Sequence, residues 1–250
     1  VLLALFGATM GQGVVWYTGQ FYALYYLQTV LNIEKTSASI IIAIALVLGT
    51  PFFIVFGALS DRIGRKKIIM AGCVIAAIAY VPIYIAMGHV ANVASFKQIS
   101  VSRALEGKTI TEYREATVTV TAASTTSTGE PKDEKTEVKP KGMTLVLPLA
   151  GLVLIQVLFV TMVYGPIAAF LVELFPTRIR YTSLSVPYHI GNGVFGGLVP
   201  LISTALQKGT GNKLMGLAYP IGIALITALV GTTMLKEGSA DSPEGAESTE

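Results

Sequence analysis

The sequence contains little charge. Lys, Arg, Asp and Glu make up 13% of the 250 residues, whereas 52% are hydrophobic. An average soluble domain carries roughly a quarter of charged residues, so this scarcity excludes a disordered chain and argues against an ordinary soluble enzyme. The net charge of +3 is small and the basic residues do not gather in one segment. We therefore expect no nucleic-acid partner.

Cysteine is nearly absent as well. Cys73 is the single cysteine, which excludes a disulfide framework and a cysteine-based zinc site. The sequence also shows no paired nucleophile and base, no cluster of metal ligands and no phosphate-binding loop. We therefore expect no enzymatic activity, no metal and no cofactor.

Long charge-free runs fill most of the chain. About 20 apolar residues of helix cross the hydrocarbon core of a bilayer, and helices are favoured because an open sheet would leave backbone groups unpaired in lipid. The sequence predicts an all-α membrane protein with six transmembrane helices, at about residues 3–31, 37–59, 68–88, 144–172, 183–206 and 214–235.

The chain divides into four segments. Residues 1–88 hold the first three spans, 89–143 a polar insert, 144–235 the last three spans, and 236–250 a tail that we predict to be disordered. Within the insert, residues 96–116 could form a short amphipathic helix, 117–129 have strand propensity, and 130–142 are predicted to be disordered. The insert is either an external substrate-gathering or partner-binding lobe or, as we favour, a tolerated loop elaboration.

The short loops predict the orientation. Four basic residues (Arg62, Arg65, Lys66 and Lys67) lie between the second and third spans, and two (Arg178 and Arg180) between the fourth and fifth. With alternating spans both loops fall on one side, which their basic residues assign to the cytoplasm. We expect a multi-pass protein of the plasma (inner) membrane, with both ends of the chain cytoplasmic and the insert outside. Val1 opens in mid-hydrophobic pattern, so we also expect a preceding part of the protein.

The glycines suggest close helix packing. Gly191, Gly193 and Gly196 spell G-x-G-x-x-G, but a dinucleotide-binding motif would need a preceding strand and an amphipathic helix, and this one lies in an uncharged apolar run. We interpret Gly193 with Gly197, and Gly7 with Gly11, as pairs that let helix backbones approach.

Polar residues within the spans are candidates for a substrate cavity. The candidates are Tyr17, Gln20, Gln156, His189 and Asn192. His189 is the one ionisable side chain clearly inside a predicted span, where such residues are costly and usually functional. Aromatic side chains of the first span could hold a quaternary ammonium by cation–π contact. The alternative for each candidate is hydrogen bonding or packing between helices.

The most specific string is Gly57–Lys67, which matches G-x-x-x-D-R-x-G-R-[KR]-[KR]. The matching residues are Gly57, Asp61, Arg62, Gly64, Arg65, Lys66 and Lys67. This pattern resembles the loop motif of the major facilitator superfamily. The stretch from Tyr164 to Pro200 is similar to its metabolite:proton symporter branch, which includes proline/betaine, shikimate, citrate and 2-oxoglutarate carriers. The chain as a whole resembles the C-terminal six-helix half of such a carrier.

The resemblance implies a twelve-span fold of two halves, with the substrate at their interface and transport by alternating access. A small organic solute, protons, the bilayer and an N-terminal half absent from this sequence would then be the partners. It also implies that loop charges hold the cytoplasmic helix ends together. We predict that Glu173 pairs with Arg62 or Arg65, that Asp61 faces a helix N-terminus of the absent half, and that Arg178 flanks the cluster. The alternatives are a facilitator without proton coupling, a membrane sensor or scaffold, and a loop that only anchors topology.

Overall fold

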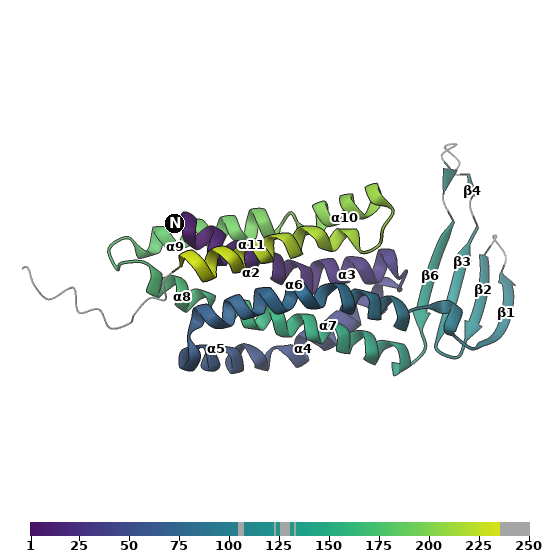
Figure 1. Ribbon diagram of the computed structural model, residues 1–250. Helices are drawn as coiled ribbons and strands as arrows, with labels where there is room; N and C mark the ends of the chain where they lie inside the picture. Colours follow the sequence, from purple (N-terminus) through teal and green to yellow (C-terminus); the bar gives the residue numbers. More distant parts are fainter. Residues whose placement is uncertain (105–107, 123, 126–130, 133, 236–250) are drawn as a thin grey trace, which may run out of the picture.

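The apolar runs fold into helices that lie side by side along one axis, with a β-sheet at one end (Figure 1). This computed structural model describes all residues except 105–107, 123, 126–130, 133 and 236–250. The tail predicted to be disordered, 236–250, lies outside the described residues. We call the end of the bundle that carries the sheet the sheet end, and the end that carries residues 60–67 the loop end.

Helical turns account for most of the described chain; η marks π or 3₁₀ turns. In order, these elements are α1 (Leu2–Ala4), η1 (Leu5–Thr9), α2 (Met10–Tyr17), η2 (Thr18–Tyr22), α3 (Ala23–Tyr25), η3 (Tyr26–Val30), α4 (Lys35–Gly49), α5 (Pro51–Ile63), α6 (Arg65–Val90), η4 (Val93–Ser95), α7 (Met143–Tyr164), α8 (Ile167–Leu174), α9 (Arg180–His189), η5 (Ile190–Gly196), α10 (Val199–Thr210), η6 (Met215–Leu217) and α11 (Ala218–Met234). The predicted all-α class is confirmed only in part: most of the described chain is helical, but the insert between α6 and α7 contains strands.

Among the described residues, five helices are long and apolar enough to cross a membrane. They are Lys35–Ile63, Arg65–Val90, Met143–Leu174, Arg180–Thr210 and Met215–Met234, and they coincide with the second to sixth predicted spans. Residues 2–30 form a further helical run in which α and π turns alternate. Three π segments interrupt that run and one interrupts 180–210. Such π turns are frequent at functional sites of helices.

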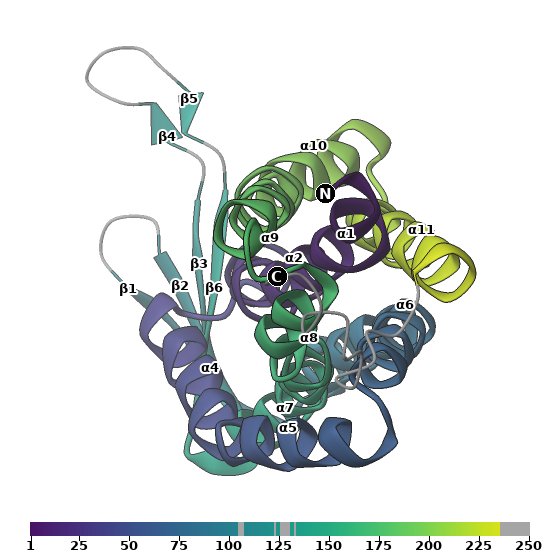
Figure 2. The same cartoon turned by 90° about the vertical axis from the view of Figure 1, so that its left-hand side faces the viewer.

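The helices leave one side of the bundle open. Seen along the axis, α4 and α5 lie on one side of α7 and α8, and α9 and α10 lie on the other (Figure 2). Helices α6 and α11 lie across the bundle from the sheet. Only 17% of the apolar window of Lys35–Ile63 and 22% of that of Arg180–Thr210 is buried, against 56% for Arg65–Val90. We call the side between α4–α5 and α9–α10 the open face.

The insert folds as a sheet and not as predicted. Strands β1 (Gln98–Ala104), β2 (Lys108–Tyr113), β3 (Ala116–Thr121) and β6 (Lys135–Pro140) form an antiparallel sheet in the order β1-β2-β3-β6, and β4 (Ser124–Thr125) pairs with β5 (Pro131–Lys132). The helix predicted at 96–116 is wrong, and so is the disorder predicted for 135–140. The strand propensity of 117–129 is confirmed at β3. The Lys/Glu-rich stretch is ordered because its alternating residues pair along β3, so its charges share one face.

The sheet is attached to the bundle at the β6 side. Ala116, Val118 and Val138 are buried in the same hydrophobic core as the helices. The connection between the first two helical runs adds backbone pairing, because the Glu34 N–H donates to the Val138 carbonyl (2.9 Å) and the Val138 N–H donates to the Asn32 carbonyl (2.7 Å). These contacts fix where the sheet lies relative to the helices.

Candidate functional site

A tight turn at the loop end joins α5 to α6. Gly64 adopts φ 106° and ψ 127° between the two helices, a conformation that is strained for residues with a Cβ atom. A single residue therefore reverses the chain, and Asp61 in the last turn of α5 comes within reach of Arg65 in the first turn of α6.

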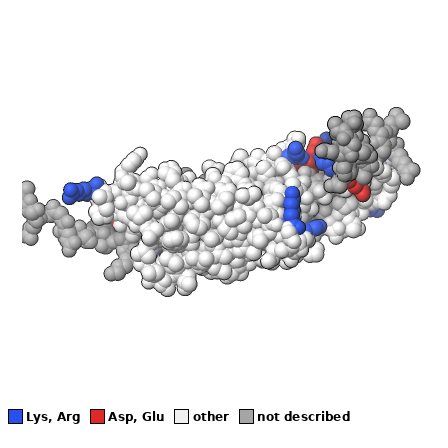
Figure 3. All heavy atoms as spheres, turned by 90° about the horizontal axis from the view of Figure 1, so that it is seen from above, with Lys and Arg blue, Asp and Glu red and all other residues white. Residues whose placement is uncertain are grey.

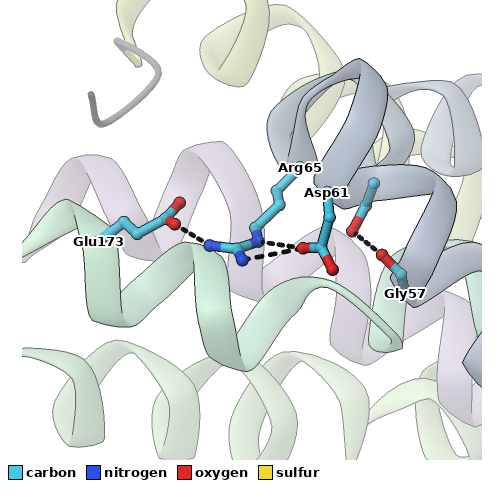
Figure 4. Close-up of polar contacts among 5 residues, drawn as sticks. Gly57, Asp61, Arg65 and Glu173 are labelled. Carbon is cyan, nitrogen blue, oxygen red and sulfur yellow. Dashed lines mark hydrogen bonds and ion pairs between the residues drawn. The ribbon is translucent and has the colours of Figure 1, made fainter. Parts of the chain in front are cut away.

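Arg65 joins three segments in one polar cluster. Its Nε and Nη2 donate to Asp61 Oδ1 at 3.2 and 2.9 Å, and its Nη1 donates to Glu173 Oε1 on α8 (Figure 4). The side chains of Arg65 and Glu173 are 24% and 29% exposed, and that of Asp61 is 60% exposed. The structure thus contains the Glu173–Arg65 pair expected from the sequence. We call Asp61, Arg65 and Glu173 the arginine cluster.

The other basic residues of the motif have different surroundings. The Lys66 ammonium donates to the carbonyls of Thr232 (3.2 Å) and Leu235 at the end of α11, where a cation complements the helix dipole. Arg62, Lys67 and Arg178 are exposed. Asp61 lies against Arg65, and its expected approach to a helix of an absent half stays a prediction.

The α5 backbone lies close to Gly165, whereas a Cβ atom on Gly57 itself would meet nothing within 4 Å. A Cβ atom built on Gly165, between α7 and α8, would lie 3.4 Å from the Phe53 carbonyl oxygen and 3.6 Å from the Gly57 nitrogen. The Ser60 hydroxyl donates to the Gly57 carbonyl at 2.7 Å (Figure 4). These contacts bring the α5 backbone against the residues that lead into α8. Glu173 lies in the last turn of that helix.

A second polar contact joins the first helical run to η5. Gln12 Nε2 donates to Asn192 Oδ1 and Asn192 Nδ2 donates to Gln12 Oε1, each at 3.0 Å. Asn192 Nδ2 also donates to the Tyr188 carbonyl, and the Thr9 hydroxyl donates to the Pro187 carbonyl at 2.7 Å. Gln12 is fully buried. We call Gln12 and Asn192 the amide pair. Gln12 was not among the substrate-cavity candidates named from the sequence, because its helical spacing from Tyr17 did not identify it as one.

Glycines allow this approach, although not the expected pair. A Cβ atom on Gly191 would lie 2.6 Å from the Thr9 hydroxyl oxygen, and one on Gly196 would lie 2.6 Å from Tyr17 Cδ2. Gly193 has nothing within 4 Å, so the predicted packing role of Gly193 with Gly197 is wrong. The prediction for Gly7 and Gly11 is confirmed: they face α11, with Gly11 against Thr227.

Aromatic side chains from four helical runs meet beside the amide pair. Trp16 of α2 stacks on Tyr164 of α7 with ring centres 6.0 Å apart, and Phe53 of α5 lies edge-on to Tyr164 at 5.9 Å. The Tyr164 and Tyr188 hydroxyls are 2.9 Å apart. Trp16 also contacts Tyr17 edge-on at 5.0 Å. We call Trp16, Tyr17, Phe53, Tyr164 and Tyr188 the aromatic floor.

The remaining sequence candidates are divided between surface and core. Gln20 is half-buried and His189 is exposed at the end of α9, next to Tyr188. Gln156 is fully buried; its Nε2 lies 3.6 Å from Met87 Sδ and 3.5 Å from the Leu152 carbonyl oxygen. The structure therefore places Tyr17 in the aromatic floor and Asn192 beside it, whereas Gln156 is buried between packed helices.

The face of the helices seen in Figure 3 is largely uncharged between its two ends. Together with the five apolar helices, this charge distribution defines the class: the chain is an integral membrane protein with several spans. The sequence model described as Major Facilitator Superfamily matches residues 1–109, so this part of the chain is similar to that superfamily.

Relatives of the chain carry transporter names. A putative proline/betaine transporter of Staphylococcus aureus is 23% identical over 234 residues, which cover 88% of this chain and 36% of that protein. A citrate-proton symporter of Salmonella typhi is 27% identical over 210 residues, 84% of this chain and 36% of that protein. One from Klebsiella pneumoniae is 37% identical over 76 residues, 30% of this chain and 17% of that protein. The chain thus spans about a third of the length of these relatives, and no solved structure matches it.

Proposed function

We propose that this chain is one six-helix half of a plasma-membrane carrier that moves a small organic solute by alternating access. The helical run 2–30 is the first of its six spans. The second half covers the open face, and substrate binds between the halves. We assign the loop end to the cytoplasm, because basic residues in short loops favour that side, and the sheet end to the outside.

The observation that carries this proposal is the aromatic floor. Side chains from α2, α5, α7 and α9 meet there through ring contacts and the Tyr164–Tyr188 hydroxyl pair. A bundle that only anchored another domain would have no need to bring polar and aromatic groups of four helices together in lipid. Neutral hydrogen-bonding groups among apolar rings are typical of binding sites for small molecules.

The substrate class that fits the floor best is a betaine-like osmolyte or a zwitterionic amino acid. Aromatic faces attract quaternary ammonium groups, and the carboxamides and hydroxyls beside them can donate hydrogen bonds to a carboxylate. An organic acid is the other class that the relatives' names suggest, since two of them are named citrate-proton symporters. We place His189 and Gln20 among the residues that face substrate.

The proposed coupling ion is the proton, as in the relatives named symporters. One observation favours a second candidate, a facilitator without coupling. Within the described helical residues of 2–90 and 143–234, the carboxylates are Asp61 and Glu173, and both contact Arg65 at the loop end. A proton-carrying carboxylate would then have to come from the other half.

The arginine cluster is the proposed cytoplasmic gate. It holds α5, α6 and α8 together when the carrier is open to the outside, and it separates when the cytoplasmic side opens. An ion pair that is partly exposed contributes about 0–1 kcal/mol, which is small enough to break and re-form in each cycle. Even a free-energy difference of this size shifts the ratio of outward-open to inward-open carriers severalfold.

The experiment is uptake into proteoliposomes by the full-length protein that contains this chain, with residues 1–250 alone as the control. We expect uptake of radiolabelled glycine betaine or proline above citrate by the full-length protein, stimulated by an inward proton gradient, and none by residues 1–250. Uptake that does not depend on the proton gradient would favour a facilitator without coupling. Absence of uptake for every solute would contradict transport and favour a sensor or scaffold.

A further inference from the structure

The sheet at the external end has two chemically different faces. Residues paired across neighbouring strands lie on the same side of a sheet, and successive residues alternate. Val118 pairs with Val138 and with Thr111, and these residues share the side on which Val118 and Val138 enter the helical core. We call this side the inner face and the opposite side the outer face.

Charge separates the two faces. The outer face carries five charged residues: Lys108, Glu112, Lys135, Glu137 and Lys139. On the inner face of β1, β2, β3 and β6, the register places one charged residue, Arg103 on the edge strand, and otherwise Val, Thr, Ala, Pro, Tyr and Gln residues. A sheet surrounded by water on both sides has no need to keep one face uncharged, so a partner for the inner face is indicated.

The helices of this chain cover only part of that inner face. Val118 and Val138 are 5% and 1% exposed, whereas Val101 on β1 is 56% exposed. The ends of β3 and β6 that lead into β4 and β5 project beyond the bundle in both views (Figures 1 and 2). Seen along the axis, the strands lie on the same side of the bundle as the open face (Figure 2). The overhanging part of the sheet is therefore next to whatever covers the open face at this end.

We propose that the overhanging inner face packs on the external helix ends of the carrier's other half, so that the sheet bridges the two halves. This inference rests on the proposed function. Three observations favour this occupant over a separate protein. The sheet lies on the side of the bundle where the open face lies (Figure 2). The relatives are nearly three times as long as the aligned region, and an uncharged Val/Thr face suits helix ends better than a charged lipid headgroup layer.

The chain offers matched positions for a test by cysteine labelling. Thr109 and Thr136 lie on the inner face of the overhanging part, whereas Thr119 and Thr121 lie on the outer face, and all four are half-buried in this chain. Each would be replaced by cysteine in the full-length protein, in membranes. Cys73 is fully buried, so a membrane-impermeant maleimide added outside reports the introduced thiols.

We expect Thr109→Cys and Thr136→Cys to react at least about tenfold more slowly than Thr119→Cys and Thr121→Cys. A thiol covered by a packed contact reacts with maleimide only when that contact opens locally, which is rare. In residues 1–250 alone, the four rates should become similar. Equal rates in the full-length protein would overturn the proposal. A difference that persists in residues 1–250 alone would also overturn it, because the bilayer surface or this chain itself would then cover the face. Protection that disappears on dilution into excess lipid would assign the face to a second copy instead.

Uptake by the same variants separates this inference from the function on which it rests. Equal labelling in a protein that still transports would contradict the bridge and leave the carrier assignment intact. Protected inner-face thiols in a protein that moves no solute would contradict the carrier assignment and retain the contact between the two parts.

Discussion

The arginine cluster and the amide pair both connect distant segments, but they differ in charge and in surroundings. The cluster consists of acidic and basic side chains, which are between 24% and 60% exposed. The amide pair is neutral, its Gln12 is fully buried, and its backbones meet at glycines. Water near a helix end lowers the cost of separating charges, whereas an unpaired carboxamide among apolar groups has no substitute partner.

This difference suggests different roles in a transport cycle. A contact that water can replace is suited to opening and closing, so the arginine cluster would change during the cycle. A neutral contact supported by close backbone packing is suited to staying intact, so the first helical run and η5 would move together. The four predictions that follow test this division, beginning with the largest expected effect.

Replacing Gly191 should disrupt the permanent contact. In Gly191→Leu a side chain would have to occupy the space of Thr9, where even a Cβ atom would lie 2.6 Å from the hydroxyl oxygen. Overpacking of this kind costs about 1–3 kcal/mol or more, so we expect the folded full-length protein to fall at least about fivefold. Gly193→Leu is the matched control, because Gly193 has nothing within 4 Å. Size-exclusion profiles of the solubilised variants measure the effect, and equal profiles would contradict the packing assignment.

Removing the charge of Glu173 should weaken the arginine cluster, the contact that we expect to open during the cycle. In Glu173→Gln the carboxamide cannot form the ion pair with Arg65, which at this exposure contributes about 1 kcal/mol. Ser185 lies on α9 and is half-buried, so a thiol introduced there can report opening. We expect uptake to fall about fivefold and cytoplasmic labelling of a Ser185→Cys thiol to rise by a similar factor, with substrate affinity nearly unchanged.

Two further variants sharpen this prediction. Arg178→Gln removes an exposed charge nearby and should leave labelling at its original level. The swap Glu173→Arg with Arg65→Glu should restore part of the uptake. If Glu173→Gln changes neither labelling nor uptake, the loop charges only anchor topology.

Separating the amide pair should show strong coupling between its members. Gln12→Leu leaves Asn192 only its hydrogen bond to the Tyr188 carbonyl, and Asn192→Leu removes the partner of Gln12. Interhelical hydrogen bonds in membranes contribute about 0.6–1.7 kcal/mol. We expect the double variant to be destabilised by less than the sum of the single variants. Thermal unfolding in detergent measures this cycle. Additive losses would show that the two amides act independently.

The smallest effect is expected for His189→Ala. His189 is exposed at the end of α9, so its removal should leave abundance and thermal stability unchanged. If it faces substrate on the open face, uptake should fall about threefold, in the range of a single exposed hydrogen bond. An unchanged uptake and pH profile would assign His189 to the contact between halves or to lipid.

Much of the fold could be predicted from local properties of the chain. Charge-free runs located the five membrane-capable helices. The residues from Gly57 to Lys67 indicated a resemblance to the major facilitator superfamily, which in turn implied a pair of Glu173 with Arg62 or Arg65; the structure contains the pair with Arg65. The insert could not be predicted in the same way. Residues 96–116 and 135–140 have no strong local preference, and their strands exist because they pair with each other and with β3.

The site was predicted only in part, because burial inside a bundle depends on neighbours. Gln156 and Gln12 are both glutamines within apolar runs, yet Gln12 finds a reciprocal partner 180 positions away and Gln156 lies against Met87. Helical periodicity identifies the residues that share a face. It does not identify the helix that this face meets.

Composition and spacing alone determined that this chain belongs in a membrane, since the cost of burying charge in lipid leaves a pattern that any window of about 20 residues can reveal. The tertiary structure decided which glycines touch, which amides pair, and that the insert is a sheet with a charged and an uncharged face. The physical reason is that these features arise from contacts between residues far apart in the chain. Their free energies depend on packing and pairing partners and not on the residues taken one at a time.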